Sequence, residues 1–228
     1  MVLWRQWRAV WDWKLERRRD ELHHPQELQV VLDTPFALVL AGGGARGAYE
    51  AGVLRFILGE LPKRIGHPIR AELICGSSVG GLNGAAIGAW NGDPQGPMEL
   101  SDFWSNLTVA DIYRFEALDL LRSPMRLLRG PADNELAWVD ARPLHSVMRD
   151  FFPWQQLWNC IDDGRLRALV TTATDVHSGQ IVQFVDGSLK GESTTGNRGV
   201  RTEYTRIKPE HVLASCAIPF LFPPINID

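Results

Sequence analysis

Short apolar runs alternate with longer amphipathic stretches along most of the chain. Four runs have the length of buried strands, and a glycine or a turn sequence follows each of them: 36–41, 71–75, 166–173 and 180–185. Helical spacing of apolar residues predicts helices at 46–60, 78–90, 141–151 and 210–216. The first of these helices has an apolar face formed by Tyr49, Val53, Phe56 and Ile57. Strands that alternate with helices predict the α/β fold class, with a mainly parallel sheet.

The segments between these elements are predicted from their breakers and caps. Residues 61–69 are expected to form a turn, and the polar, glycine-rich stretch 189–202 is expected to form a loop. Residues 98–158 are predicted to be mostly helical, with breaks at three prolines. Asp140 comes directly before the predicted helix at 141–151, so we expect it to cap that helix.

The N-terminal stretch differs in composition from the rest of the chain. Residues 3–22 are predicted to form an amphipathic helix, whose apolar stripe consists of Trp4, Trp7, Trp11 and Leu15. Arginine and lysine residues surround that stripe. Tryptophan and arginine together suit a peripheral contact with a membrane surface, whereas the alternative interpretation is packing against the domain or a partner. The chain is therefore predicted to comprise a helix and linker at 1–34 and a main domain at 35–228.

Composition limits the function classes. The chain has 228 residues, of which 45% are hydrophobic and 22% charged, as in an ordinary globular protein. A formal net charge of −3 gives no reason to expect nucleic-acid binding. Three cysteines without metal-ligand spacing favour a reducing, cytoplasmic compartment. No apolar stretch reaches the roughly 20 residues of a membrane span, so any membrane contact would be peripheral, at the inner face.

Two glycine motifs each stand between a predicted strand and a predicted helix. The first runs from Gly42 through Gly43, Gly44 and Arg46 to Gly47 and matches G-x-G-x-x-G. Such a turn directs backbone N–H groups at an anion, which can be a dinucleotide phosphate or the oxyanion formed during ester hydrolysis. Alone, this motif does not separate the two.

The second motif points to a nucleophilic serine. Gly76, Ser77, Ser78, Val79 and Gly80 match G-x-S-x-G, and only Ser78 has glycine two positions before and two positions after it. The glycines let the backbones cross at a tight turn, which exposes the serine oxygen at the start of a helix. A nucleotide-binding fold explains the first motif only. The pair therefore predicts a serine nucleophile with a neighbouring oxyanion loop.

With these motifs in place, the sequence resembles the patatin-like phospholipases. The resemblance rests on the two glycine blocks at 38–54 and 76–85, on 214–224, and on the strand and turn at 173–180. It implies a three-layer α/β/α fold, a Ser–Asp dyad, and hydrolysis of lipid esters through an acyl-serine at Ser78. It implies no metal or other cofactor. Gly42, Gly43 and Gly44, together with the Arg46 N–H, would then hold the oxyanion.

One departure concerns the aspartate of the dyad. In the family it follows the segment that resembles 214–224, so we expect it beyond Asp228 and expect this chain to be truncated before it. The internal Asp186-Gly187-Ser188 sequence stands on the wrong side of that segment. The alternative function is then a lipid-binding or partner-binding fragment that lacks its base. The oligomeric state is not predicted.

A second alternative is a catalytic triad within the chain. Ser78, Asp175 and His211 follow the order of α/β-hydrolases, and His177 and His145 are further candidates for the histidine. A histidine seen only in sequence is more often structural, which makes the triad the weaker hypothesis. A nucleotide-binding protein is the weakest, because no Lys-Ser or Lys-Thr follows the first glycine motif.

Overall fold

The computed structural model describes residues 35–113, 140–150, 152–189, 199–218 and 222–227. The chain divides after Pro35, and the fold presented below is that of the unit Phe36–Asp228. The helix predicted at 3–22 lies outside the described residues.

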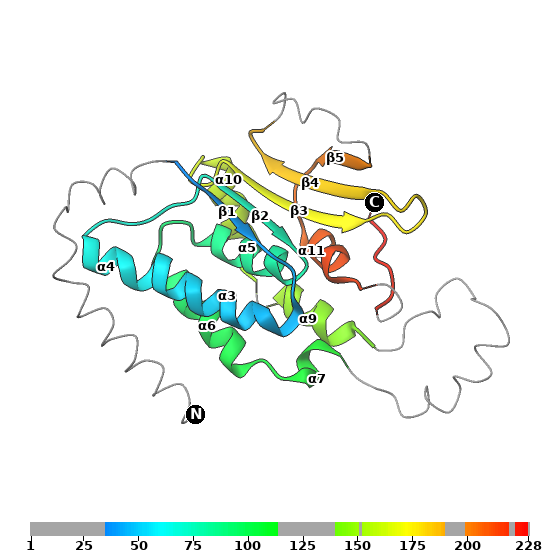
Figure 1. The fold of residues 1–228 in the computed structure, drawn as a ribbon, viewed down its shortest axis with the longest axis horizontal. Coiled ribbons are helices and arrows are strands. Elements are labelled where there is room, and N and C mark those ends of the chain that lie inside the picture. Colours follow the sequence, from blue (N-terminus) through cyan, green and yellow to red (C-terminus); the bar gives the residue numbers. More distant parts are fainter. Residues whose placement is uncertain (1–34, 114–139, 151, 190–198, 219–221, 228) are drawn as a thin grey trace. The chain divides into compact units, whose positions relative to one another are not determined.

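A five-stranded sheet forms the centre of this unit (Figure 1). Its strands are β1 (Ala37–Leu40), β2 (Leu73–Ser77), β3 (Ala168–Thr174), β4 (Ile181–Gly187) and β5 (Val200–Tyr204), and they pair in that order. β1, β2 and β3 are parallel neighbours, β4 runs antiparallel to β3, and β5 runs parallel to β4. The predicted α/β class with a mainly parallel sheet is thus confirmed.

The hairpin between β3 and β4 explains the single antiparallel pairing. Gly179 has a positive φ of 69°, a conformation that glycine adopts without strain, and its N–H donates to the carbonyl of Asp175 at 2.8 Å. Such a short turn can join only antiparallel strands. β5 was not expected, because Val200–Tyr204 overlaps the predicted loop at 189–202. It is a half-exposed edge strand, so it lacks the apolar run that marks the other four.

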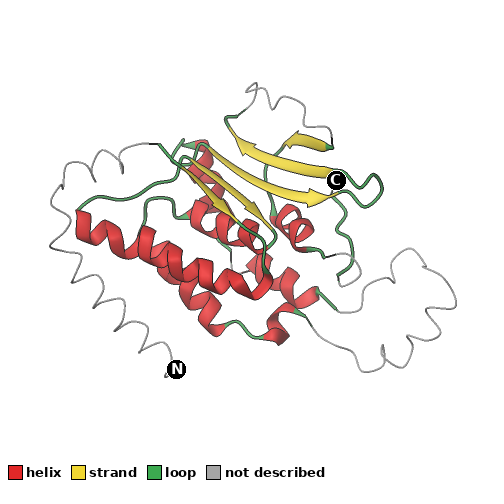
Figure 2. Cartoon of the chain, in the orientation of Figure 1, coloured by secondary structure: helices red, strands yellow, loops and turns green. Residues whose placement is uncertain are grey.

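One helix lies entirely inside the molecule. α5 (Val79–Ala89) follows β2, and all of its residues are buried. Its glycines permit close packing, because a Cβ at Gly84 would lie 3.0 Å from Ile74 and a Cβ at Gly88 would lie 2.9 Å from Leu157. The helices α10 (Trp154–Asp162) and α11 (Pro209–Cys216) pack beside α5. These three helices pack against the sheet, α5 on β1 to β3, α11 on β3 and α10 on β4 (Figure 2).

A long helical segment follows the first glycine motif. It consists of the 3-10 turn η1 (Gly44–Arg46), α3 (Gly47–Leu54), the π-helical turn η2 (Arg55–Glu60) and α4 (Leu61–Ile65). The prediction of a turn at 61–69 was therefore wrong for its first half, where the helix continues to the left-handed Gly66. The predicted apolar face is also not the buried one. Ala51, Leu54 and Leu58 are buried, whereas Tyr49 is 77% exposed.

The region predicted to be mostly helical contains four helices in its described parts. They are α6 (Gln95–Asn106), α7 (Val109–Ile112), α9 (Arg142–Asp150) and α10. Asp140 caps α9 as expected, because its carboxylate accepts the backbone N–H of Arg142 at 2.9 Å. None of the described helices is long and apolar enough to span a bilayer.

Candidate active site

Ser78 occupies a strained turn between β2 and α5. Its backbone has φ 53° and ψ −127°, and it is the only described non-glycine residue with a positive φ. A Cβ at Gly76 would run into the carbonyl of Gly80, and a Cβ at Gly80 would run into the carbonyl of Leu40. The two glycines of the motif are therefore required by the crossing backbones, as the sequence pattern predicted.

The glycine-rich loop after β1 lies directly against this turn. β1 and β2 are parallel neighbours with Leu40 opposite Gly76, so both turns leave the sheet at the same edge. A Cβ at Gly42 would lie only 3.3 Å from the Cβ of Ser78. Gly44 is exposed and has a positive φ of 55°. The structure thus brings together two motifs that lie apart in the sequence, at 42–47 and 76–80.

The backbone N–H of Arg46, which was predicted to face the oxyanion, bonds within the glycine loop instead. It donates to the carbonyl of Gly43 at 3.2 Å, so this amide is already used within the loop. The Arg46 side chain folds back along the loop, with its Nε 3.1 Å from the place of a Cβ on Gly43. The Arg46 N–H is therefore removed from the predicted donors to the oxyanion, and the backbone N–H groups of the glycines remain the candidates.

Gly47, the last glycine of the first motif, serves packing. It is buried at the start of α3, and a Cβ there would overlap the side chains of Val79 and Trp104. Val79 is the first residue of α5, so this contact sets the distance between the two helix N-termini. Larger residues at position 47 would push the glycine loop away from Ser78.

A buried polar network joins the same elements and was not found from the sequence. The Nδ2 atom of Asn83 lies 3.1 Å from both the Gly47 carbonyl and the Glu50 carboxylate, and its Oδ1 accepts the indole N–H of Trp104 at 2.8 Å. Glu50 also accepts the N–H of Ala41 at 3.1 Å. The side chain of Asn83 is fully buried and fully bonded, so it fixes α3, α5 and α6 relative to one another.

The third contributor to the site is α11. The Ser215 Oγ accepts the backbone N–H of Ser78 at 2.7 Å, across 137 residues of sequence. Desolvation raises the pKa of the neighbouring Cys216 thiol to about 12, against a smaller lowering effect of the Ser78 side chain. Cys216 is therefore a neutral thiol at physiological pH.

The candidate triad partners of Ser78 have other bonds. Asp175 accepts the backbone N–H groups of His177 and Ser178 and lies 3.5 Å from Arg201, which together hold the pKa of its carboxyl low. Thr172 is opposite Ser77 in the sheet, so Asp175 lies three residues, or roughly 10 Å, farther along β3. His211 is buried on α11, accepts the N–H of Lys208 at 3.1 Å through Nδ1, and packs its ring edge against Phe184.

His177 and His145 also lack a bond to the serine. The His177 side chain is 95% exposed in the turn after β3. His145, on α9, lines a small hollow that Cys216 also borders, and desolvation lowers its pKa. No described imidazole or carboxylate is hydrogen-bonded to the Ser78 side chain.

Asp186 lies toward the other end of the sheet. It pairs with Leu169, whereas Ser77 pairs with Thr172, so Asp186 and Ser78 stand toward opposite edges. Its carboxylate is buried and accepts the N–H of Ile207 at 2.9 Å. Burial raises its pKa, against the lowering effect of that bond and of Arg206. Asp186 is a structural carboxylate, in agreement with the sequence-order argument against it.

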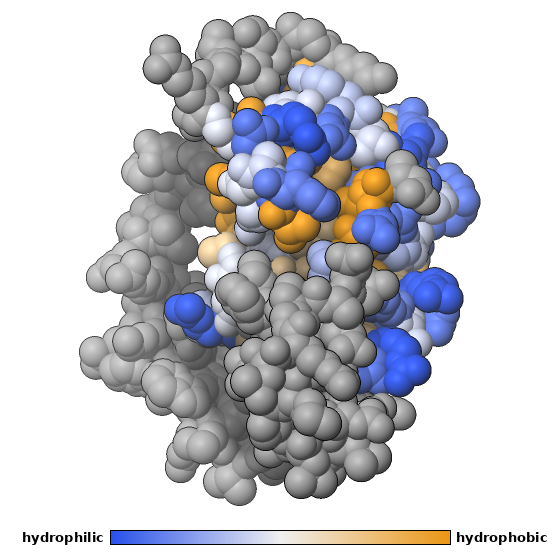
Figure 3. All heavy atoms as spheres, turned by 90° about the vertical axis from the view of Figure 1, so that its right-hand side faces the viewer, coloured by the Kyte–Doolittle hydropathy of each residue, from blue (hydrophilic) through white to orange (hydrophobic). Residues whose placement is uncertain are grey.

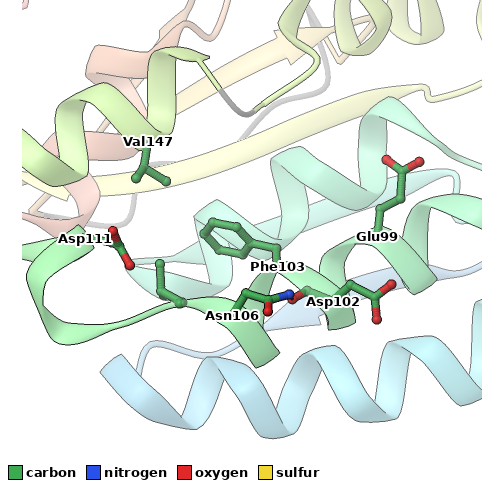
Figure 4. Close-up of a pocket in the computed structure, with 7 residues that line it drawn as sticks. Glu99, Asp102, Phe103, Asn106, Asp111 and Val147 are labelled. Atoms are coloured by element: carbon green, nitrogen blue, oxygen red, sulfur yellow. The ribbon is translucent and has the colours of Figure 1, made fainter.

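A cleft lies apart from the two glycine motifs. It has a volume of about 450 Å³ and lies between α6, α7 and α9 (Figure 4). Its lining consists of Glu99, Asp102, Phe103, Asn106, Leu107, Asp111 and Val147. Neither Ser78 nor either glycine motif contributes to it. Within the described residues, no group of three or more histidine, cysteine or acidic side chains is arranged to hold a metal ion.

Two exposed apolar side chains follow elements described above. Val176 lies in the hairpin after β3, and Ile218 follows α11; they are 65% and 51% exposed. On the side of the molecule to which β3 points, hydrophobic residues lie near the middle, with hydrophilic residues above and to the right of them (Figure 3). Such a surface suits an apolar ligand better than a charged one.

The comparison with protein families agrees with these motifs. The family model described as patatin-like phospholipase matches residues 38–228. No curated protein matches the chain by sequence. Among solved structures, the crystal structure of the type III effector protein ExoU is similar, with 15% identity and a TM-score of 0.32. The match covers 70% of this chain and 37% of that one.

Proposed function

The chain belongs to the patatin-like phospholipase family, and from that premise we propose that it is a serine hydrolase of lipid esters with Ser78 as its nucleophile. The observation that carries the proposal is the strained Ser78 turn pressed against the glycine loop. A serine held at a helix N-terminus beside free backbone amides is the arrangement that acyl transfer needs. Ile218 is apolar and exposed and lies three residues after Ser215, which supports an acyl chain as the ligand.

In the proposed reaction, the Ser78 hydroxyl attacks the ester carbonyl carbon and gives its proton to a base. The carbonyl oxygen becomes an oxyanion, which the amides of Gly43 and Gly44 stabilise by hydrogen bonds. The ester C–O bond then breaks, and the alcohol leaves with a proton, which leaves an acyl-serine. Water attacks that ester, and the fatty acid and the free serine are released.

The base is proposed to be an aspartate, as in the family that the chain belongs to. Asp175 and Asp186 each hold structural bonds, so neither is assigned this role. Ser78 is instead proposed to receive its aspartate from outside the described residues.

Hydrolysis of phospholipid vesicles tests this function. We expect a chain that carries its aspartate to release fatty acid, and we expect Ser78→Ala in that chain to lower the rate by ~10³-fold or more, because a nucleophile and its base act as a unit. Ser77→Ala is the matched control, since Ser77 is exposed and only its backbone faces the glycine loop. Equal rates for the Ser78→Ala and wild-type chains would contradict the proposal. Vesicle binding without fatty-acid release would favour the lipid-binding alternative.

A further inference from the structure

The N–H of Ser78 has an acceptor on a distant helix. Ser215, in the last turn of α11, places its Oγ 2.7 Å from that nitrogen. We propose that Ser215 is a positioning residue, which holds the backbone of the nucleophile in its reactive conformation by accepting this N–H. The proposal rests on the assignment of Ser78 as the nucleophile.

The Ser78 turn needs such a contact because its conformation is unfavourable. A non-glycine residue at φ 53° and ψ −127° carries a strain that persists only where surrounding contacts enforce it. Gly76 and Gly80 provide the space for the turn but no side-chain bond to it. The Ser78 carbonyl accepts the N–H groups of Gly81 and Leu82, at 2.8 and 3.2 Å, which holds the helix side of the residue.

Ser215 holds the other side of the same residue. With its N–H on Ser215 and its carbonyl on α5, Ser78 is fixed at both of its peptide groups. The direction of its Cα–Cβ bond, and hence the position of its Oγ, follows from those two anchors. A side-chain hydroxyl is short and has few rotamers, so it suits an anchor that must stay in place.

The bond also determines which backbone N–H groups around the site are available to a substrate oxygen. Because the Ser78 N–H points to Ser215, it is not offered to a substrate oxygen. The donors left for the oxyanion are those of the glycine loop and the first amides of α5, which have no partner within an α-helix. Loss of the Ser215 hydroxyl would free the Ser78 N–H and let the turn relax toward a less strained geometry.

Hydrogen–deuterium exchange tests this bond without any need for activity. We expect the peptide across 76–82 to exchange at least ~10-fold faster in Ser215→Ala than in the wild type, and we expect Ser215→Thr to restore slow exchange, because an amide exchanges when its hydrogen bond opens. Alanine is the best helix former, so α11 itself is not weakened by the substitution. Ser188→Ala is the control, since Ser188 is exposed and its Oγ makes only a 3.4 Å bond at the opposite end of the sheet. Should Ser215→Ala not fold, Ser215→Cys replaces it, because a thiol is a weaker acceptor of similar size.

Ester kinetics provide the second measurement. We expect Ser215→Ala to lower kcat by ~10²-fold, as expected when a reacting group is misplaced by about 1 Å, while KM stays within about twofold. Ser215→Thr should recover most of kcat. Unchanged exchange together with unchanged kcat in a folded Ser215→Ala chain would overturn the proposal. If Ser78→Ala retained full activity, the nucleophile assignment would fail instead, and the exchange result would still report on the Ser215 bond.

Discussion

Glycines around Ser78 make room for backbone, and each does so for a different neighbour. Gly80 leaves space for the carbonyl of Leu40, and Gly42 leaves space for Ser78 itself. Gly52, by contrast, lies in α3 with nothing within 4 Å of the place of its Cβ. The same substitution at positions 80 and 52 therefore has opposite consequences.

We expect Gly80→Ala to lower the free energy of unfolding by about 2–4 kcal/mol, because neither β1 nor α5 can move aside without loss of core packing. We expect Gly52→Ala to raise it by about 0.5–1 kcal/mol, because alanine is the better helix former at an uncrowded site. Urea denaturation of the two variants measures both changes. Equal effects at the two positions would show that the crowding at Gly80 is not real.

The buried imidazole of His211 predicts a pH dependence of stability. Desolvation lowers its pKa below the ordinary 6.5, so the unfolded chain binds more protons than the folded chain between these two pKa values. Above pH 6.5 the imidazole is neutral in both states, so its burial does not reduce the free energy of unfolding there. As the pH falls through 6.5, the unfolded chain takes up a proton and stability is lost, by at most about 1.4 kcal/mol per pH unit for one group.

Denaturation between pH 7.5 and pH 5 tests this sign. We expect His211→Asn to flatten the loss of stability on acidification. His145, whose pKa is also lowered, remains in the wild type and in the variant and adds the same slope to each. A steeper loss in His211→Asn than in the wild type would contradict the account.

At the scale of elements, Asn83 joins α3, α5 and α6 through one buried side chain. Its amide is bonded to the Gly47 carbonyl, the Glu50 carboxylate and the Trp104 indole. Removing that amide would leave the Trp104 indole N–H without its acceptor and would take one bond each from the Gly47 carbonyl and the Glu50 carboxylate. A buried polar group left unsatisfied costs about 1–3 kcal/mol.

We therefore expect Asn83→Ala to lower the free energy of unfolding by about 3–5 kcal/mol. Asn106→Ala, which removes only an exposed 2.8 Å bond to the Asp102 carbonyl within α6, should change it by less than about 0.5 kcal/mol. Thermal melting of the two variants compares them directly. Similar melting temperatures would mean that the Asn83 network adds little stability.

The sequence predicted those elements whose pattern is local. β1 to β4 are apolar runs, and the G-x-S-x-G spacing marks the Ser78 turn, so both follow from neighbouring residues. β5 was missed because a half-exposed edge strand needs an apolar side chain only at some positions. Its polar residues resemble those of a loop.

The remainder of the candidate site depends on contacts between distant residues. The Asn83 bonds cross between 21 and 36 residues and the Ser215 bond crosses 137, and no spacing rule links such positions. The Arg46 N–H was expected to face the oxyanion, but the 3-10 turn at 44–46 directs it to Gly43 instead. Backbone detail of this kind follows from tertiary geometry.

At the scale of the whole molecule, the fold places two strand–turn–helix units side by side. β1 and β2 are adjacent and parallel, so their two glycine turns meet at one edge of the sheet, and α11 reaches that edge from the other end of the sequence. The central claim of the account is that this arrangement makes Ser78 a nucleophile.

Covalent trapping tests that claim most directly. The intact chain is treated with a fluorophosphonate, which reacts with activated serines, and the modified residue is located by mass spectrometry of the peptides. The account predicts a single adduct on Ser78, absent from Ser78→Ala and retained in Ser77→Ala. An adduct that persists in Ser78→Ala, or one on a different residue of the wild-type chain, would contradict it.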